Sequence, residues 1–488
     1  MSEGGSKSMK WDHEADVVVV GYGGAGAAAV LAASEAGASV IVIEKNPEGG
    51  GNTRYSGGSL RTYLDTKKAS DYIETLCDGA TERDIIETFV VESGRNLEWI
   101  KAMGGEIATR PTPQSFPNSL PVAFPSTRGS DGIGPRARVK GAGDDAGIDL
   151  WGLLKRRVDD LAIRALYSAP ASQLLVDKDA GVTGVVAQHG EQTLRVRAKR
   201  GVILTCGGFE YDTQMHINYL GQKYFAMCNP ANTGDGIRLA GEVGAELWHM
   251  NGVAASLGYK FPEFEFGIRC SMPAGGFMFV DQLGQRFMDE TGTDAHLMWS
   301  PTSYIDTRTL QRKRIPCYVI FDEDTRMRGP VGVTGQGKVS DVYQWTRDNN
   351  AEIKKGWIKA ADTIGDLSRH INVRADSLQA TIAKYNLQCV GGYDPELGRA
   401  PDTLIPLGRP PYYALELWPC LFNTQGGPKR NARAQVINVR GLPIKRLYSA
   451  GELGSLWHRN YPGAGNVSEA LAFGRIAGRN AAAEIPLG

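Results

Sequence analysis

Glycines at a fixed spacing stand near the start of the chain, directly after a run of four valines. Residues 21–26 read GYGGAG, and an alanine-rich segment follows before a second apolar run that ends at Glu44. The G-x-G-x-x-G pattern allows a tight strand-to-helix turn and lets a pyrophosphate approach the N–H groups at a helix N-terminus. An acid about 20 residues further on suits the hydroxyls of a ribose. Residues 16–45 therefore predict a βαβ unit that binds a dinucleotide.

Other glycine-rich motifs follow along the chain. A loop over residues 49–58 combines glycines with Asn, Thr and Ser, and its N–H and hydroxyl donors suit the rest of a large phosphate-bearing cofactor. A flexible surface loop is the alternative for the same residues. Shorter motifs are TCGGF at 205–209, TGDG at 233–236, AGE at 450–452 and YPGAGN at 461–466. The predicted cofactor-binding residues are Gly21, Gly23, Gly24, Ala25, Gly26, Glu44, Lys45, Gly51, Asn52, Thr53, Ser56, Gly57, Gly58, Gly207, Gly208, Asp235, Gly451, Glu452, Asn466, Val467 and Ser468.

The elements that must position these motifs are strands and helices. Residues 69–103 carry a helical apolar stripe, and residues 150–163 predict an amphipathic helix. Residues 169–196 alternate as an antiparallel ribbon does, and residues 201–205 predict a buried strand that stops on glycines. A helix is predicted over residues 467–484, so glycine motifs and regular elements alternate from one end of the chain to the other.

The length of 488 residues favours two domains. Residues 1–15 are polar and predict a disordered lead-in. A higher density of Trp, Met, Tyr and Pro over residues 269–420 indicates an inserted second domain, between two parts of a cofactor-binding domain at 16–268 and 421–488. Residues 108–145 show no period and predict a long excursion from the first part.

Composition excludes several classes of partner. Lys plus Arg and Asp plus Glu each number 54, so the overall charge gives no support to a nucleic acid or an anionic membrane. Seven scattered cysteines without a C-x-x-C motif predict reduced thiols in a cytoplasm, and the seven histidines lack the spacing of metal ligands. Residues 17–33 resemble a membrane span only superficially, because they hold several glycines and too few strongly apolar residues. We expect a cytoplasmic protein with no metal, no nucleic-acid partner and no membrane span.

Taken together and in this order, the motifs resemble those of the flavoprotein superfamily of fumarate reductases and 3-ketosteroid dehydrogenases. The resemblance extends over nearly the whole chain. It implies noncovalent FAD and an α/β fold, in which a Rossmann-like FAD-binding domain carries an inserted α+β substrate-capping domain. In this superfamily the flavin N5 exchanges a hydride with a carbon next to an activated carbonyl or carboxylate, and the active site lies between the two domains.

Two positions bear on the branch of the superfamily. Enzymes of the fumarate-reductase type resemble one another in a His before the late T-x-G-G and an Arg just ahead of the G-G-N, but this chain has Asn423 and Pro462 there. The sequence YPGAG instead resembles the 3-ketosteroid Δ1-dehydrogenases, which implies that the Tyr461 hydroxyl and the Gly465 N–H hold a substrate ketone. Two such donors would stabilise a developing enolate as an oxyanion hole does. A packed aromatic beside a turn is the alternative for Tyr461.

The group that moves the proton next to the ketone is less well defined. Related dehydrogenases resemble one another in a Tyr a few residues past an N-E pair, whereas Asp294 falls near that place here. Tyr304 and His296 are further candidates. Arg326 lies in a segment similar to the one whose Arg delivers a proton in fumarate reductases, although a solvated Arg in a helix capped by Asp322 is the simpler interpretation.

These residues predict an FAD-dependent oxidoreductase that forms or reduces a C=C bond α,β to a ketone in a small apolar substrate. One alternative is a reductase of a small unsaturated carboxylic acid. Another is a flavin-binding protein without catalysis, which turnover of a ketone or enone with a dye would exclude. The sequence does not specify the direction of the reaction, the electron acceptor or donor, or the oligomeric state.

Overall fold

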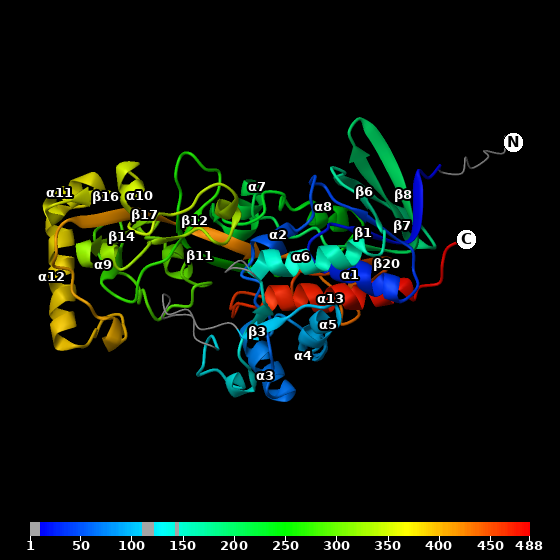
Figure 1. Ribbon diagram of the computed structural model, residues 1–488, viewed down its shortest axis with the longest axis horizontal. Helices are drawn as coiled ribbons and strands as arrows, with labels where there is room; N and C mark the ends of the chain where they lie inside the picture. The colour runs from blue at the N-terminus through cyan, green and yellow to red at the C-terminus, as the bar shows by residue number, and fades with distance from the viewer. Residues whose placement is uncertain (1–9, 110–121, 142–145) are drawn as a thin grey trace.

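The computed structural model describes residues 10–109, 122–141 and 146–488. It has two bodies, one at each side of Figure 1: a mostly parallel sheet with helices α1, α6 and α13, and a second sheet with helices α9 to α12. The predicted α/β fold with an inserted second body is confirmed. Parts of the predicted lead-in and excursion, at 1–9, 110–121 and 142–145, lie outside the described residues. Within the described ranges, no helix combines the length and the apolar character needed to cross a membrane.

The first sheet is built around β1, whose valines are buried on both faces of the sheet. Val18 pairs in parallel with Ile41 on one side and with Val202 on the other, and near-continuous apolar runs of this kind are typical of parallel sheets covered by helices. The path is β19-β20-β8-β1-β2-β5, and β6 and β7 extend it as the predicted antiparallel ribbon. The strands are β1 (His13–Val20), β2 (Val40–Ile43), β5 (Arg164–Leu166), β6 (Ala171–Asp177), β7 (Gly181–His189), β8 (Gln192–Leu204), β19 (Gln435–Ile437) and β20 (Pro443–Ser449).

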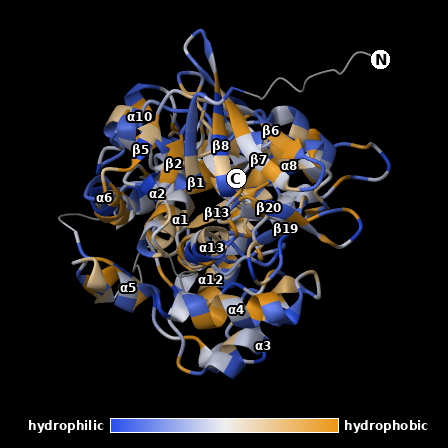
Figure 2. Cartoon of the chain, turned by 90° about the vertical axis from the view of Figure 1, so that its right-hand side faces the viewer, coloured by the Kyte–Doolittle hydropathy of each residue, from blue (hydrophilic) through white to orange (hydrophobic). Residues whose placement is uncertain are grey.

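The two ends of the chain meet where α1 (Gly24–Glu35) packs against α13 (Gly465–Ala482). Figure 2 shows the two helices side by side beneath the strands of the first sheet. A Cβ atom at Gly474 would lie 2.5 Å from the carbonyl oxygen of Ala25, and one at Gly478 would lie 2.4 Å from that of Ala29. Small residues therefore let the two backbones approach closely.

The second sheet follows the path β13-β14-β17-β11-β12-β15, with β9 and β16 also paired to β17. It includes residues well before 269, since β9 and β11 belong to it, and β17 runs past residue 420; the boundaries at 269 and 420 stay predictions. The strands are β9 (Phe225–Ala226), β11 (Val253–Tyr259), β12 (Ile268–Cys270), β13 (Phe277–Val280), β14 (Cys317–Asp322), β15 (Gly332–Val333), β16 (Lys359–Ala361) and β17 (Tyr412–Thr424).

Helices cover both sheets, and two small ribbons lie outside them. Besides α1 and α13, the helices of the first body are α2 (Gly51–Tyr55), α3 (Thr66–Cys77), α4 (Arg83–Gly94), α5 (Asn96–Ala102), α6 (Ala146–Asp159), α7 (Thr213–Met215) and α8 (Asp235–Glu242). Those of the second are α9 (Glu323–Met327), α10 (Asn350–Lys354), α11 (Ile364–His370) and α12 (Ala375–Gly391). The ribbons pair β3 (Ile107–Thr109) with β4 (Ala137–Val139), and β10 (Leu247–Trp248) with β18 (Gly427–Pro428).

Candidate functional site

A cavity of about 550 Å³ opens where the glycine motifs of the first body face the second sheet. Its wall includes all the residues predicted to bind the cofactor except Gly26, Gly208 and Ser468. These three lie behind the wall. A Cβ atom at Gly26 would lie 2.1 Å from the Gly21 carbonyl oxygen, so this glycine serves the contact between helix and strand. The Ser468 hydroxyl accepts the Arg61 N–H at 2.8 Å.

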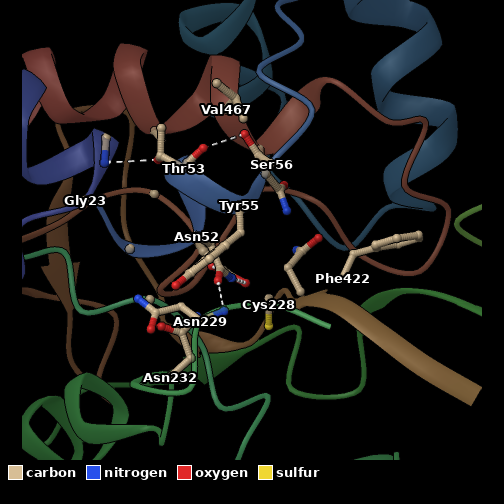
Figure 3. A pocket seen from close by; sticks show the side chains of 18 of the residues that line it. Gly23, Asn52, Thr53, Tyr55, Ser56, Cys228, Asn229, Asn232, Phe422 and Val467 are labelled. Carbon is tan, nitrogen blue, oxygen red and sulfur yellow. Dashed lines mark hydrogen bonds between the residues drawn. The ribbon is translucent and has the colours of Figure 1, made fainter. Parts of the chain in front are cut away.

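The first glycine turn and α2 form one end of the cavity. Gly21 has φ +100°, which favours glycine, and the Gly24 N–H donates to the Thr53 hydroxyl at 3.1 Å. A Cβ atom at Gly51 would lie 3.3 Å from the Cα of Gly23. Figure 3 shows Thr53 between this turn and Ser56, whose hydroxyl donates to the Thr53 carbonyl at 2.8 Å. The bare backbone therefore leaves room for phosphate oxygens beside N–H groups at the start of α1.

Glu44 follows β2 and is held rigidly. Its two carboxylate oxygens accept the N–H groups of Tyr22 and Asn46, each at 2.8 Å. Burial raises the pKa of Glu44, and these two hydrogen bonds with the charge of Lys45 oppose the rise. Each carboxylate oxygen can accept a second hydrogen bond, so Glu44 is suited to two ribose hydroxyls.

Polar side chains complete the cofactor end of the cavity. The Asn52 amide donates to both Glu452 oxygens, at 2.8 and 3.1 Å, and its oxygen accepts the Asn229 N–H at 2.9 Å (Figure 3). The Nδ2 atoms of Asn232 and Asn466 are buried, and no described residue accepts from them. Buried donors of this kind are costly unless a ligand accepts from them, so the cavity fits a large polar cofactor.

Tyr461 lies at the other end of the cavity, which we call the substrate end and define by Arg136, Arg269, Asp294, His296, Phe422 and Tyr461. The Tyr461 hydroxyl oxygen accepts the N–H groups of Gly465 and Asn466, both at 3.0 Å. The Gly465 N–H thus contacts Tyr461, and not a second point in the cavity as the sequence resemblance implied. Among the described residues the Tyr461 hydroxyl hydrogen has no acceptor. Burial raises its pKa, and the two N–H groups oppose the rise, so Tyr461 is a protonated and polarised donor.

His296 and Asp294 form a pair beside Tyr461. One Asp294 carboxylate oxygen accepts both the backbone N–H and the Nδ1 of His296, each at 2.9 Å. Burial lowers the pKa of His296. Burial acts to raise the pKa of Asp294, but the interactions with His296 and Arg136 outweigh it, so the pKa of Asp294 is also lowered. An ionised carboxylate can only accept, and Nδ1 therefore carries the proton. The Nε2 atom of a neutral His296 is left as a basic site without a partner among the described residues.

Sequence reasoning missed two cations of the substrate end. Arg136 lies within the predicted excursion of residues 108–145, and its Nη2 donates to the Pro462 carbonyl at 3.2 Å. Arg269 lies on β12 with its guanidinium 5.4 Å from the centre of the Phe422 ring. The one sequence feature that could have indicated Arg269 as a site residue is its place as a single charged residue in an otherwise apolar strand. At Pro462, where the reductases carry an arginine, a guanidinium is thus brought from elsewhere in the chain.

Tyr304 and Arg326 are not brought to the cavity. Tyr304 is 51% exposed, with the Arg314 guanidinium 4.7 Å from its ring centre. Arg326 is buried in α9, where it forms an ion pair with Glu323 at 2.6 Å. The predicted Asp322 cap of this helix is present. Neither residue lines the cavity that contains Tyr461.

The described residues contain no group of three or more His, Cys, Asp or Glu side chains that could hold a metal. All seven cysteines are free, and burial raises the pKa of both cavity cysteines, Cys206 to about 12 and Cys228 well above its usual value. Thiolate chemistry at the cavity is therefore disfavoured at neutral pH.

Comparisons with known proteins identify the family of the chain. The family described as FAD binding domain matches residues 16–468. The NADH:fumarate oxidoreductase of Klebsiella pneumoniae (strain 342) is 26% identical over 498 residues, which cover 98% of this chain but 48% of that protein, so the chain spans about half of its length. The 4-oxocyclohexanecarboxylate 2-dehydrogenase of Sinomonas cyclohexanicum is 26% identical over 552 residues, covering 96% of this chain and 93% of the relative.

Among solved structures, the 3-ketosteroid Δ1-dehydrogenase from Sterolibacterium denitrificans superimposes with a TM-score of 0.83 at 22% identity, over 97% of this chain and 100% of that one. This likeness shows the fold. The family match, by contrast, spans the glycine turn, Glu44 and the final YPGAGN motif around the cavity. The chain belongs to the FAD binding domain family.

Proposed function

We propose that this protein is an FAD-dependent oxidoreductase that forms or reduces a C=C bond α,β to a ketone. The observation that carries the proposal is the Tyr461 hydroxyl, a neutral donor that faces the cavity and whose oxygen already accepts two N–H groups. Those two hydrogen bonds make the O–H a stronger donor. A ketone oxygen placed there would gain most from it when negative charge develops on the oxygen.

His296 is the proposed proton-transfer residue, and Asp294 is proposed to orient it. The hydrogen bond from His296 Nδ1 to Asp294 leaves Nε2 as the basic atom of the ring. Asp294 thus orients the base, as the third residue of a catalytic triad does. The His296 ring centre is 5.1 Å from that of Tyr461, so both groups can act on neighbouring atoms of one substrate. A pKa below the ordinary value keeps His296 neutral and able to accept a proton at neutral pH.

The cofactor would be held by the glycine turn, Glu44, Asn52 and the start of α13. FAD supplies, when bound, an acceptor or donor of the hydride. The chain's own part is to fix the substrate by its oxygen, to move the α-proton through His296 and to exclude water with the second sheet. The names of two relatives, one for a 4-oxo acid and one for fumarate, agree with chemistry at a C–C bond next to a carbonyl or carboxylate.

A reductase of a small unsaturated carboxylic acid is the second candidate, favoured by Arg136 and Arg269 in the cavity wall. We expect cyclohex-2-enone to reoxidise the dye-reduced enzyme faster than fumarate does. Fumarate has two carboxylates, and the one placed at Tyr461 would meet a neutral donor where it needs a cation. Stopped-flow absorbance of the flavin measures both rates. Fumarate reoxidation as fast as that by any enone would favour the second candidate, and no reoxidation by either compound would favour a non-catalytic protein.

Glu44→Ala is expected to weaken FAD binding by about 1–3 kcal/mol, because hydrogen bonds between a carboxylate and ribose hydroxyls are lost. Titration of the apoprotein with FAD, followed by flavin fluorescence, measures the change. Glu35→Ala, at an exposed position of α1, is the matched control and should bind FAD as the parent does. Equal affinity for FAD in Glu44→Ala and Glu35→Ala would contradict the role of Glu44.

We predict that FAD is bound noncovalently, so acid precipitation should release the yellow colour into the supernatant. Colour that stays in the pellet would contradict noncovalent binding. The cytoplasmic location and the electron partner stay predictions.

A further inference from the structure

Arg61 is a buried arginine that contacts the YPGAG turn from outside the cavity. The residue is 2% exposed and does not belong to the cavity wall. Its Nη2 atom donates to the carbonyl oxygens of Pro462 and Gly463, both at 2.6 Å. Its backbone N–H donates to the Ser468 hydroxyl in the first turn of α13. Arg61 therefore holds both the turn and the start of the helix that follows it.

The turn between Tyr461 and α13 has an unusual backbone. Gly463 has φ +69° and Ala464 has φ +56°, so two successive residues lie in the left-handed region, which is unfavourable for an alanine. In this conformation the N–H groups of Gly465 and Asn466 both donate to the Tyr461 oxygen at 3.0 Å. Because such a conformation persists only where its surroundings hold it, the contacts of the buried guanidinium support the orientation of the tyrosine hydroxyl.

No ion pair neutralises the charge of Arg61 among the described residues. Arginine stays protonated in proteins, and no described group accepts from its Nη1 atom. The other buried arginines of the described ranges each pair with a glutamate: Arg326 with Glu323, Arg399 with Glu290, Arg430 with Glu469 and Arg475 with Glu92. A cation buried without a counter-charge is destabilising, and its field reaches neighbouring groups with little screening.

Tyr461 is the cavity residue that this field reaches. Burial raises the pKa of its hydroxyl, and the N–H groups of the turn together with the charge of Arg61 oppose the rise. The positive charge therefore favours negative charge on the Tyr461 oxygen and on a ligand oxygen that accepts from this hydroxyl. A neutral ketone gains little from such a field, whereas the oxygen of an enolate gains much.

We propose that Arg61 is a positioning residue: it holds the turn that orients the Tyr461 hydroxyl, and its charge, from behind the cavity wall, stabilises the oxygen anion that forms there. This inference rests on the proposed function and adds to it a residue that does not touch the substrate. The charge is in place before the reaction begins, so no reorganisation is needed as the anion develops. Its contribution should appear in kcat and not in KM, because the ground-state ketone is neutral.

Arg61→Gln and Arg61→Lys separate the charge from the hydrogen bonds, because both new side chains can donate to a carbonyl but only lysine is a cation. With the best ketone or enone, we expect kcat per bound FAD to fall about 10- to 100-fold in Arg61→Gln, with KM within about twofold of the parent. Arg61→Lys should stay within about fivefold of the parent in kcat. Equal losses in the two variants, or a kcat of Arg61→Gln within about threefold of the parent, would overturn the inference.

Two further variants control for folding. Arg399→Gln is the matched control and should keep the parent's kcat per bound FAD. Arg399 is also buried and also donates to two carbonyl groups, those of Phe277 and Thr403, but it lies outside the cavity wall. Arg61→Met buries an apolar side chain of similar length and serves as the neutral variant if Arg61→Gln does not fold. Thermal melting and FAD content of each variant identify a folding defect.

A ligand that reports charge without turnover gives a second, independent measurement. 4-Nitrophenol absorbs at different wavelengths as the neutral phenol and as the phenolate, and its oxygen can accept from Tyr461 as an enolate oxygen would. We expect the bound probe to ionise at a lower pH in the FAD-loaded parent than in water, and at a pH about one unit higher in Arg61→Gln than in the parent. His296, Asp294 and Arg136 face the same space in every variant, so the difference between variants measures Arg61. Equal ionisation in the parent and Arg61→Gln would overturn the inference.

The two measurements distinguish a failure of this inference from a failure of the proposed function. Turnover of a ketone with an unchanged kcat in Arg61→Gln overturns the role of Arg61 and leaves the ketone chemistry standing. Phenolate stabilisation that depends on Arg61, without turnover of any ketone or enone by the parent, overturns the proposed function and leaves a site for an oxygen anion.

Discussion

Replacing Tyr461 with Phe is expected to slow turnover of the best ketone or enone about 30- to 1000-fold. The change keeps the ring that packs between His296 and Trp457 and removes only the hydroxyl. A donor to an oxygen that becomes negative in the transition state contributes on the order of 2–4 kcal/mol, which corresponds to this range of rates. Single-turnover reduction of the flavin by substrate measures the step in which that charge develops.

The same hydroxyl has a structural partner, and the control must separate the two roles. The N–H groups of Gly465 and Asn466 lose their acceptor in Tyr461→Phe, so we expect the free energy of unfolding to fall by about 1–3 kcal/mol. Rates are therefore taken per bound FAD. Tyr385→Phe is the matched control, because it removes a buried hydroxyl bonded to the Ile405 carbonyl and lies outside the cavity wall. A Tyr461→Phe rate within about threefold of the parent would end the ketone proposal.

The cofactor end of the cavity could be predicted because its determinants are local in sequence. Gly21 needs a positive φ within a single turn, and Glu44 follows the next strand of the same βαβ unit. Each glycine motif predicts the local backbone conformation at its own position, and a parallel sheet brings the carboxyl ends of its strands to one edge. The motifs therefore predicted one shared site although they are spread over more than 400 residues of chain.

The substrate end could not be predicted in the same way, because its residues meet only through the packing of the two bodies. Arg136 precedes β4, Arg269 lies on β12 and Phe422 on β17, and no short motif links them. The comparison at Pro462 predicted the loss of a cation, whereas the Pro462 carbonyl accepts hydrogen bonds from Arg61 and Arg136. Comparing single positions with a family motif detects that the arginine is absent at Pro462. It does not detect a guanidinium that another element of the chain brings to the same place.

β8 shows the same limit at the level of secondary structure. Its residues 197–200 read Arg-Ala-Lys-Arg, a polar run that separates the predicted ribbon from the predicted buried strand. In the structure the strand is continuous from Gln192 to Leu204, because it pairs with β7 along its first half and with β1 further on. Pairing on both sides outweighs the low strand propensity of the polar residues.

His296→Asn is expected to slow dehydrogenation of a saturated ketone about 10²- to 10⁴-fold, the range of a lost general base. The Asn amide can still donate to Asp294 from the position of Nδ1, but it has no basic atom in place of Nε2. Because the pKa of His296 is lowered, the parent should lose activity only as the pH falls below the ordinary histidine value of about 6.5. Its kcat profile should show that acidic limb, and His296→Asn should lack it.

Asp294→Asn distinguishes a positioning role from a direct one. If Asp294 orients His296, an amide in its place can donate to Nδ1 and leave the proton on Nε2, so the rate should again fall about 10²- to 10⁴-fold. If Asp294 were itself the base, His296→Asn would keep most of the activity. The acidic limb of the parent would then follow the lowered pKa of Asp294, below its usual value, and would be absent between pH 5 and 7. Since His296→Asn keeps the hydrogen bond to Asp294 and removes only the basic atom, its rate and its pH profile together decide which of the two side chains accepts the proton.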